Sequence, residues 1–344
     1  MQVARIHEHG DPEVLRVEEI ERPSPGAGEV LVRVLGASIN HLDLWVRRGM
    51  PGFPVGFPRI LGCDGTGELV EVGEGVDDLE LGTQLVLEPG YTDGPSPATE
   101  RGADHMAPDY QIRGEHGDGF DAEYVVLPRQ YVFPLPAGVD PVQAAAVPLV
   151  FLTAWGMVVE RAQLAAGETC LVLGGASGVG SAAIQIARQR GARVIATAGS
   201  EEKRALASEL GAHEVVDHRD EAWAKEIKRL TDGRGCDVVV EHVGPATWAS
   251  SMKALAHCGR LVTCGGTTGP MVQIALPHLF IKQQSILGST MGPRSALPTI
   301  FEHVAAGDFR PVLDRALPLS EIREAHELLE SRAVAGKLVL VPGS

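Results

Sequence analysis

The sequence predicts an α/β fold in which a doubly wound parallel sheet follows a β-barrel-like region. Beyond residue 165, apolar runs of strand length alternate with amphipathic segments of helix length, a pattern typical of a parallel sheet with crossover helices. Residues 3 to 86 instead show short β-like runs separated by glycine turns. At 344 residues the chain exceeds the usual size of a single hydrophobic core, so two domains are expected.

The stretch 170–204 is interpreted as a strand, a glycine turn, a helix and a second strand. Its turn resembles the dinucleotide pattern G-x-G-x-x-G, with a serine at the second glycine position. Glycine permits the tight turn and the close approach of a phosphate, whose charge the N-terminus of the helix favours. We therefore expect a Rossmann nucleotide site that uses Gly175, Ser177, Gly178, Val179 and Gly180.

The second strand of this unit ends at Ala198, Gly199 and Ser200, without the acidic residue that binds ribose hydroxyls in NAD sites. Such an acid would repel a 2′-phosphate. Its absence, together with Ser200, Lys203 and the following Arg204, therefore favours NADP(H). The alternative is NAD(H), with the two basic residues forming only a solvated helix face.

Composition excludes several classes of function. The net charge of −15 argues against a nucleic-acid partner and against docking on an anionic membrane. The five cysteines never occur as Cys-x-x-Cys, and no apolar segment follows a basic one at the N-terminus, so a cytoplasmic location is expected. The long apolar stretch 142–159 contains Gln143, Pro148 and Thr153 and favours a buried helix over a membrane span.

Taken together, these features resemble the medium-chain dehydrogenase/reductase superfamily, which includes zinc alcohol dehydrogenases and zinc-free quinone oxidoreductases. Besides the glycine turn, the resemblance rests on segments 25–32, 40–49, 61–72, 119–128, 148–155, 259–262 and 336–340. It implies a GroES-like β-barrel domain made of residues 1–130 and 293–344. A Rossmann domain would occupy residues 131–292, with the active site in the cleft.

The resemblance also implies that no catalytic zinc is present. Zinc members of the superfamily have cysteine, histidine and cysteine where this chain has Asn40, Cys63 and Leu149. A catalytic zinc needs about three protein ligands, which only a new arrangement of His41, Cys63 and Asp64 could supply here. The region expected to hold a second zinc, residues 90–107, has no cysteine. Residues 88–119 are expected to form a lobe, a lid or a disordered insert.

The zinc-free branch implies an NADPH-dependent reductase whose substrate is a small quinone or α,β-unsaturated carbonyl. Hydride would pass from C4 of the nicotinamide to the electron-poor carbon. Asn40, with His41 or water, would support the carbonyl oxygen or supply a proton, and Asp43 would brace the loop. Alternatively, Asp43 pairs with Arg47 or Arg48, and His41 is an exposed loop histidine.

The same resemblance implies further cofactor contacts. Thr153 would meet the nicotinamide carboxamide, Gly265 and Gly266 would let the cofactor pass close to a strand end, and Lys337 would approach the phosphates. Their structural alternatives are a helix-interior hydroxyl, a plain turn and an edge-strand charge.

The other functions considered are a zinc alcohol dehydrogenase with unusual ligands and a nucleotide-binding protein with little catalysis. The apolar strand 285–290 is expected at a sheet edge, where relatives pair, which predicts a homodimer or homotetramer.

Overall fold

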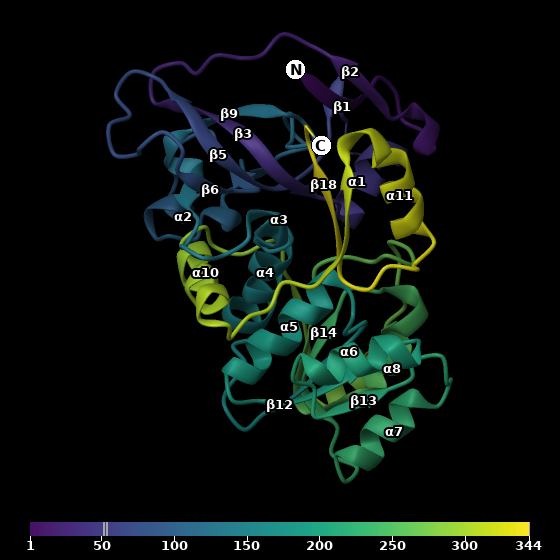
Figure 1. Cartoon of the computed structure of the whole chain (residues 1–344). Helices are drawn as coiled ribbons and strands as arrows, with labels where there is room; N and C mark the ends of the chain where they lie inside the picture. The colour runs from purple at the N-terminus through teal and green to yellow at the C-terminus, as the bar shows by residue number, and fades with distance from the viewer. Residues whose placement is uncertain (51, 53, 344) are drawn as a thin grey trace. The chain divides into compact units, whose positions relative to one another are not determined.

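The computed structural model describes residues 1–50, 52 and 54–343 and divides the chain into two units (Figure 1). The first comprises Met1–Leu149, Pro293–Gly307 and Pro311–Ser344, and the second comprises Val150–Gly292 and Asp308–Arg310. The expected α/β class, with a barrel-like domain and a Rossmann domain, is confirmed.

The first boundary lies beyond the expected residue 130. Strand β10 (Val132–Pro134) pairs with β6 (Gln84–Leu87), and α3 (Pro141–Ala144) packs on β3 (Glu29–Ser38). These contacts keep residues 131–149 in the first unit.

The main sheet of the first unit has seven strands. Its order is β10-β6-β5-β3-β18-β17, with β9 also paired to β3; smaller sheets have the orders β2-β1-β4 and β7-β8. The remaining strands are β1 (Gln2–Ile6), β2 (Arg16–Glu19), β4 (Arg59–Ile60), β5 (Asp64–Val72), β7 (Gly90–Tyr91), β8 (Gln111–Ile112), β9 (Tyr124–Pro128), β17 (Leu313–Pro318) and β18 (Lys337–Val341).

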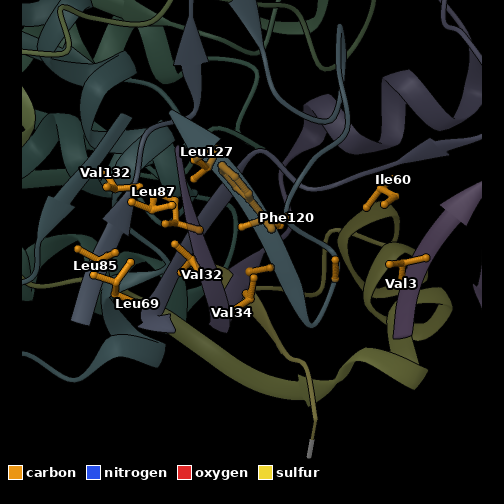
Figure 2. Packing of buried hydrophobic residues seen from close by; sticks show 14 of the residues in the cluster. Val3, Val32, Val34, Ile60, Leu69, Leu85, Leu87, Phe120, Leu127 and Val132 are labelled. Atoms are coloured by element: carbon orange, nitrogen blue, oxygen red, sulfur yellow. The ribbon is translucent and has the colours of Figure 1, made fainter. Parts of the chain in front are cut away.

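The barrel core forms because apolar residues alternate along these strands. On β3, Val30, Val32 and Val34 are buried in one cluster that also contains Phe120 and residues of β5, β6 and β9. Figure 2 shows Phe120 among these side chains, with Leu85, Leu87 and Val132 grouped on one side. Each fully buried aliphatic or aromatic side chain contributes about 1.5–3 kcal/mol, so this cluster stabilises the scaffold on which the polar loops sit.

The end of the chain completes the first unit. Strand β18 pairs antiparallel with β3, Val339 opposite Ser38 and Leu340 opposite Ala37 (Figure 1). This pairing places Lys337, the first residue of β18, next to the loop that follows β3. The helices of the unit are α1 (His41–Arg48), α2 (Pro97–Glu100), α3, α10 (Ala296–Ala306) and α11 (Ile322–Glu330), with 3₁₀ turns at Pro12–Val14, Asp104–Met106, Arg129–Tyr131 and Leu319–Glu321.

Residues 88–119 form a folded lobe. It contains the β7-β8 ribbon and α2, whose N-cap Ser96 accepts a hydrogen bond from Thr99 N at 3.2 Å. The guanidinium of Arg113 lies 4.7 Å from the centre of the Tyr91 ring. Cation–π and capping contacts therefore order a segment whose sequence lacks helical or strand periodicity.

The second unit is a six-stranded parallel sheet in the order β13-β12-β11-β14-β15-β16. Because right-handed crossovers run in opposite directions from β11, the helices on the two sides of that strand cover opposite faces. The strands are β11 (Thr169–Val172), β12 (Arg193–Thr197), β13 (Glu214–Val216), β14 (Cys236–Glu241), β15 (Leu255–Thr263) and β16 (Ser285–Gly288).

Local signals set the helix ends in this unit. Helix α5 (Gly178–Gln189) begins where the Ser177 hydroxyl accepts a hydrogen bond from Gly180 N at 3.0 Å, and Gly191 follows it with φ +77°. The other helices are α4 (Pro148–Trp155, whose first two residues belong to the first unit, followed by a π-helical turn at Gly156–Arg161), α6 (Glu201–Glu209), α7 (Trp223–Leu230), α8 (Pro245–Ala254) and α9 (Leu276–Ile281). Among the described residues, no helix is both long and apolar enough to span a bilayer.

Candidate active site

The glycine turn joins β11 to α5 in the second unit. Gly174 has φ +58°, and a Cβ on Gly180 would collide with the Gly174 carbonyl oxygen. Glycine is therefore required for the turn to close this tightly. Gly178 and Val179 stand in the first turn of α5, where backbone N–H groups have no acceptor within the helix. This half-exposed cradle fits a pyrophosphate.

A second loop lies beside the glycine turn, at the point where the strand order reverses. His242, after β14, has Nε2 2.8 Å from the Leu173 carbonyl oxygen, and burial lowers its pKa. Glu241 is fully buried and accepts hydrogen bonds from Val243 N at 2.7 Å and Gly244 N at 3.0 Å. These contacts fix the loop at the topological switch point, where doubly wound folds bind ligands.

The end of β12 carries the residues expected to select the cofactor. Ser200 caps α6 by accepting a hydrogen bond from Lys203 N at 3.2 Å. Just after the next strand, β13, Asp217 pairs with Arg204 at 2.9 Å and with Arg219 at 3.0 Å, and hydrogen bonds from Arg219 lower its pKa. Two guanidinium groups thus neutralise this carboxylate.

Gly265, Gly266 and Thr153, the other residues of this unit that were expected to contact the cofactor, lie on two different elements. Gly265 and Gly266 belong to the loop after β15, which contacts the β14 loop through Thr268 N and the Val243 carbonyl oxygen, 2.9 Å apart. Thr153 lies buried on α4, and its hydroxyl donates to the Met291 sulfur at 3.6 Å.

In the first unit, the loop between β3 and α1 is held by Asp43. This carboxylate is buried and accepts hydrogen bonds from Asn40 N at 2.7 Å and from Gly62 N at 3.0 Å. Burial raises its pKa to about 6, against the lowering effect of these hydrogen bonds and of Lys337. Asp43 therefore ties the loop at residue 40 to the loop at residue 62.

The two arginines considered as alternative partners of Asp43 form ion pairs with another carboxylate. Arg47 and Arg48 both pair with Glu330, on α11. His41 is the first residue of α1, half-buried, with its ring 6.5 Å from that of Trp45.

The Asn40 side chain lies in a buried polar cluster. It is 6% exposed, and its amide nitrogen donates to Asp64 Oδ2 at 2.9 Å and is close to Ser38 O at 3.2 Å and Cys63 Sγ at 3.3 Å. Its amide oxygen accepts a hydrogen bond from the Lys337 ammonium. Both ends of the amide are thus engaged by internal groups.

Lys337 differs from the expected phosphate ligand. Its side chain is 5% exposed, and Nζ donates to Ile39 O at 2.8 Å and to Asp64 Oδ2 at 3.3 Å, besides Asn40. With three oxygen partners in a buried place, the ammonium belongs to the Asn40 cluster.

The residues at the expected zinc-ligand positions do not fit that metal. Leu149 offers no ligand atom on its side chain, and the Asn40 amide, a weak zinc ligand in any case, is engaged by Asp64 and Lys337. In the part of the chain that the structure describes, no group of three or more His, Cys, Asp or Glu side chains has metal-binding geometry.

Asp121 is a residue that sequence reasoning missed. It is fully buried, and neither carboxylate oxygen has a hydrogen-bond partner among the described residues. Burial, then the negative charge of Asp43, raises its pKa well above the ordinary value. Its position next to Gly62, and hence next to the Asp43 loop, depends on a backbone contact that no local pattern predicts.

Two family models match the chain. Residues 26–137 match the alcohol dehydrogenase GroES-like domain, and residues 178–306 match the zinc-binding dehydrogenase domain. A quinone oxidoreductase from Pseudomonas aeruginosa is 32% identical over 97% of both chains. The chain belongs to the medium-chain dehydrogenase/reductase superfamily.

Solved structures from this superfamily agree closely in fold. The crystal structure of an NAD-dependent alcohol dehydrogenase has 45% identity and a TM-score of 0.96 over the whole of both chains. A cobalt- and zinc-bound thermostable alcohol dehydrogenase from Pyrobaculum aerophilum has 32% identity and a TM-score of 0.89 over 99% of both chains. The expected superfamily and its quinone oxidoreductase-like branch are therefore confirmed, and the chain is an oxidoreductase that uses a nicotinamide cofactor.

The buried Asp121 makes stability depend on pH. In the folded state the raised pKa keeps the Asp121 carboxyl protonated, whereas the same carboxyl in the unfolded chain loses its proton at about pH 4. Since the folded state then binds more protons, the free energy of unfolding falls as pH rises. Asp121→Asn is neutral at every pH. In thermal melts, the Tm of Asp121→Asn should therefore rise relative to the Tm of the wild type between about pH 4.5 and about pH 8.

The control for this variant is Asp77→Asn, at an exposed site. The difference in Tm between this control variant and the wild type should stay small at both pH values. An Asp121→Asn effect that is the same at both, or that becomes less favourable at the higher pH, would contradict the role assigned to the buried carboxyl.

Proposed function

We propose that this protein is an NADPH-dependent reductase that passes hydride to a quinone or an α,β-unsaturated carbonyl without a catalytic zinc. The observation that carries the proposal is the chemistry of the positions where zinc relatives have ligands. An amide engaged at both ends, a buried cysteine and a leucine stand there, at Asn40, Cys63 and Leu149. The similarity to quinone oxidoreductases along nearly the whole chain supports the same class.

The substrate class follows from what a metal would otherwise contribute. Oxidation of an alcohol relies on a Lewis acid to stabilise the alkoxide. In a conjugated acceptor, the charge that develops on hydride addition spreads over an enolate, which hydrogen-bond donors can stabilise. The nicotinamide cofactor, when bound, supplies the hydride.

The contacts of Asn40 refine its proposed role. Since its amide is engaged at both ends and 6% exposed, we assign it to organising the loop rather than to binding the substrate oxygen. His41, the next residue, is more exposed and stands at the N-terminus of α1, and we propose it as the donor to that oxygen. Asp43 braces both residues through Asn40 N.

For the cofactor we propose NADP(H). The glycine turn at Gly175, Ser177, Gly178, Val179 and Gly180 would hold the pyrophosphate, and the Gly265–Gly266 loop and Thr153 would adjoin the rest of the cofactor. Ser200 and Lys203 would bind a 2′-phosphate. The neutralised charge of Asp217, between two arginines, supports this preference because an unpaired acid there would oppose the phosphate.

A second candidate is an NAD-dependent alcohol dehydrogenase. It is favoured by the 45% identity to a structure with that name. A nucleotide-binding protein with little catalysis would share the glycine turn, so turnover and not binding separates it from the two enzymes.

The proposal predicts NADPH oxidation, followed at the absorbance of the reduced nicotinamide, with a panel of quinones and enones. NADPH should be used with a higher kcat/KM than NADH. Simple alcohols with NADP⁺ or NAD⁺ should give little turnover, because the residues at the zinc-ligand positions would not hold a Lewis acid. His41→Phe should lower kcat by about tenfold or more while leaving NADPH binding unchanged, since it removes a donor that acts on the substrate.

Trp45→Phe, a nearby change that keeps an aromatic ring, is the matched control for the histidine variant and should retain most activity. Clear NADPH binding without turnover of any acceptor would reject the reductase proposal. Efficient alcohol oxidation with NAD⁺ would favour the second candidate instead.

We also propose that the protein associates with a second copy of itself along β16, the edge strand of the six-stranded sheet. An edge strand exposes unpaired backbone groups. Exposed apolar side chains precede it, including Leu276 at 62%, Phe280 at 67% and Ile281 at 66%. An apolar group beside an open strand edge suits burial against a like surface in a two-fold pair.

This proposal predicts at least a dimer in light scattering at micromolar protein concentration. Phe280→Glu should shift the wild-type species toward the monomer, because it buries a charge in the apolar contact. Leu81→Glu alters a residue of similar exposure far along the chain and should leave the mass unchanged. A monomeric wild type would disprove the association.

A further inference from the structure

The three segments that carry zinc ligands in related enzymes are joined here by one carboxylate. Asp64 Oδ1 accepts a hydrogen bond from Leu149 N at 2.5 Å, and Oδ2 accepts from Asn40 Nδ2 at 2.9 Å and Ser38 Oγ at 3.0 Å. Asp64 itself is fully buried and directly follows Cys63. One residue thus connects the loop after β3, the start of β5 and the start of α4.

The cation that balances this carboxylate comes from the far end of the chain. Lys337 Nζ lies 3.3 Å from Asp64 Oδ2 and 2.8 Å from Ile39 O, and it also donates to Asn40 Oδ1. It is the only lysine outside residues 203–282. A buried ammonium therefore stands among the same segments that a metal ion would otherwise link.

We propose that the Lys337 ammonium acts as a built-in cation at this position, with Asp64 as its counter-ion. Lys337 and Asp64 are then positioning residues: they hold Asn40, and through it His41 at the start of α1, in place. This inference rests on the proposed function only in that the activity measurements below assume a quinone acceptor and NADPH.

The ion pair can persist in the interior because hydrogen bonds offset the free energy that its two ions lose on leaving water. A buried ion pair persists when each ion also has hydrogen bonds, and removing one partner leaves an uncompensated buried charge. Asp64 has four donors and Lys337 three acceptors, which meets that condition. The ammonium on Asn40 Oδ1 also polarises the amide and strengthens its N–H donors, which draws the loops together.

A double-mutant cycle separates positioning from folding. The variants are Lys337→Met, Asp64→Asn and the two combined, with Lys253→Met, an exposed lysine on α8, as the control. For each protein we would measure Tm, the NADPH dissociation constant by fluorescence titration, and kcat and KM for a quinone acceptor. Should either single variant fail to fold, the double variant, which buries no lone charge, still provides the comparison with the wild type.

The expected result is a lowered Tm in each single variant and a double variant that loses less than the sum of the two. The kcat should fall by about tenfold to a hundredfold in the double variant too, with NADPH affinity unchanged, because the loop is no longer held in position. Additive Tm losses, or a double variant whose kcat recovers together with its Tm, would overturn the inference.

Failure of the proposed function gives a different outcome. If the wild type turns over no acceptor, the reductase proposal fails, and crystal structures of the wild type and double variant decide the positioning claim. Displacement of Asn40 relative to Gly62 in the double variant would support it, and an unchanged position would overturn it.

Discussion

The polar site of the first unit depends on the buried ion pair between Lys337 and Asp64. Burying two ions costs several kcal/mol per ion, and only a dense set of hydrogen bonds offsets that cost. Here the bonds come from Asn40, Ser38, Leu149 and Ile39, so the pair and its surroundings stabilise each other. Since Lys337 begins the strand that pairs with β3, this site is complete only when the two ends of the chain have folded together.

The candidate site of the second unit consists mainly of backbone groups. The parallel strands of this unit end in loops that gather at the reversal of strand order, where the glycine turn lies beside the loop fixed by Glu241 and His242. Few charges are needed there, because helix N-terminal N–H groups and close backbone approach suffice to bind phosphate. The first unit contains the buried polar cluster of Asn40, Asp64 and Lys337, and the second contains the glycine turn. Each unit is internally ordered by its own hydrogen bonds.

Much of this architecture is predictable from sequence because its signals are local. The glycine turn and the alternation of strands and helices are short-range patterns, and the structure shows them in the expected places. By contrast, the lobe at residues 88–119 is ordered by capping, ribbon pairing and contacts such as that between Arg113 and Tyr91, which leave no periodic pattern.

The parts that sequence reasoning missed are contacts between distant residues. Lys337 lies 273 positions from Asp64, and its place at a strand start suggested an exposed charge or a phosphate ligand, not a buried partner. Asp121 looked unremarkable because only tertiary packing removes its carboxyl from water. The domain boundary at Leu149 depends on the pairing of β10 with β6, which local sequence does not specify.

In our proposal, the Lys337 ammonium takes the structural role of a catalytic metal. Elemental analysis of the purified protein, prepared with zinc in the medium, tests this together with turnover before and after exhaustive chelation. Zinc should be well below stoichiometric amounts, and chelation should leave NADPH-linked turnover unchanged. Stoichiometric zinc that is removed by the chelator together with the activity would contradict it.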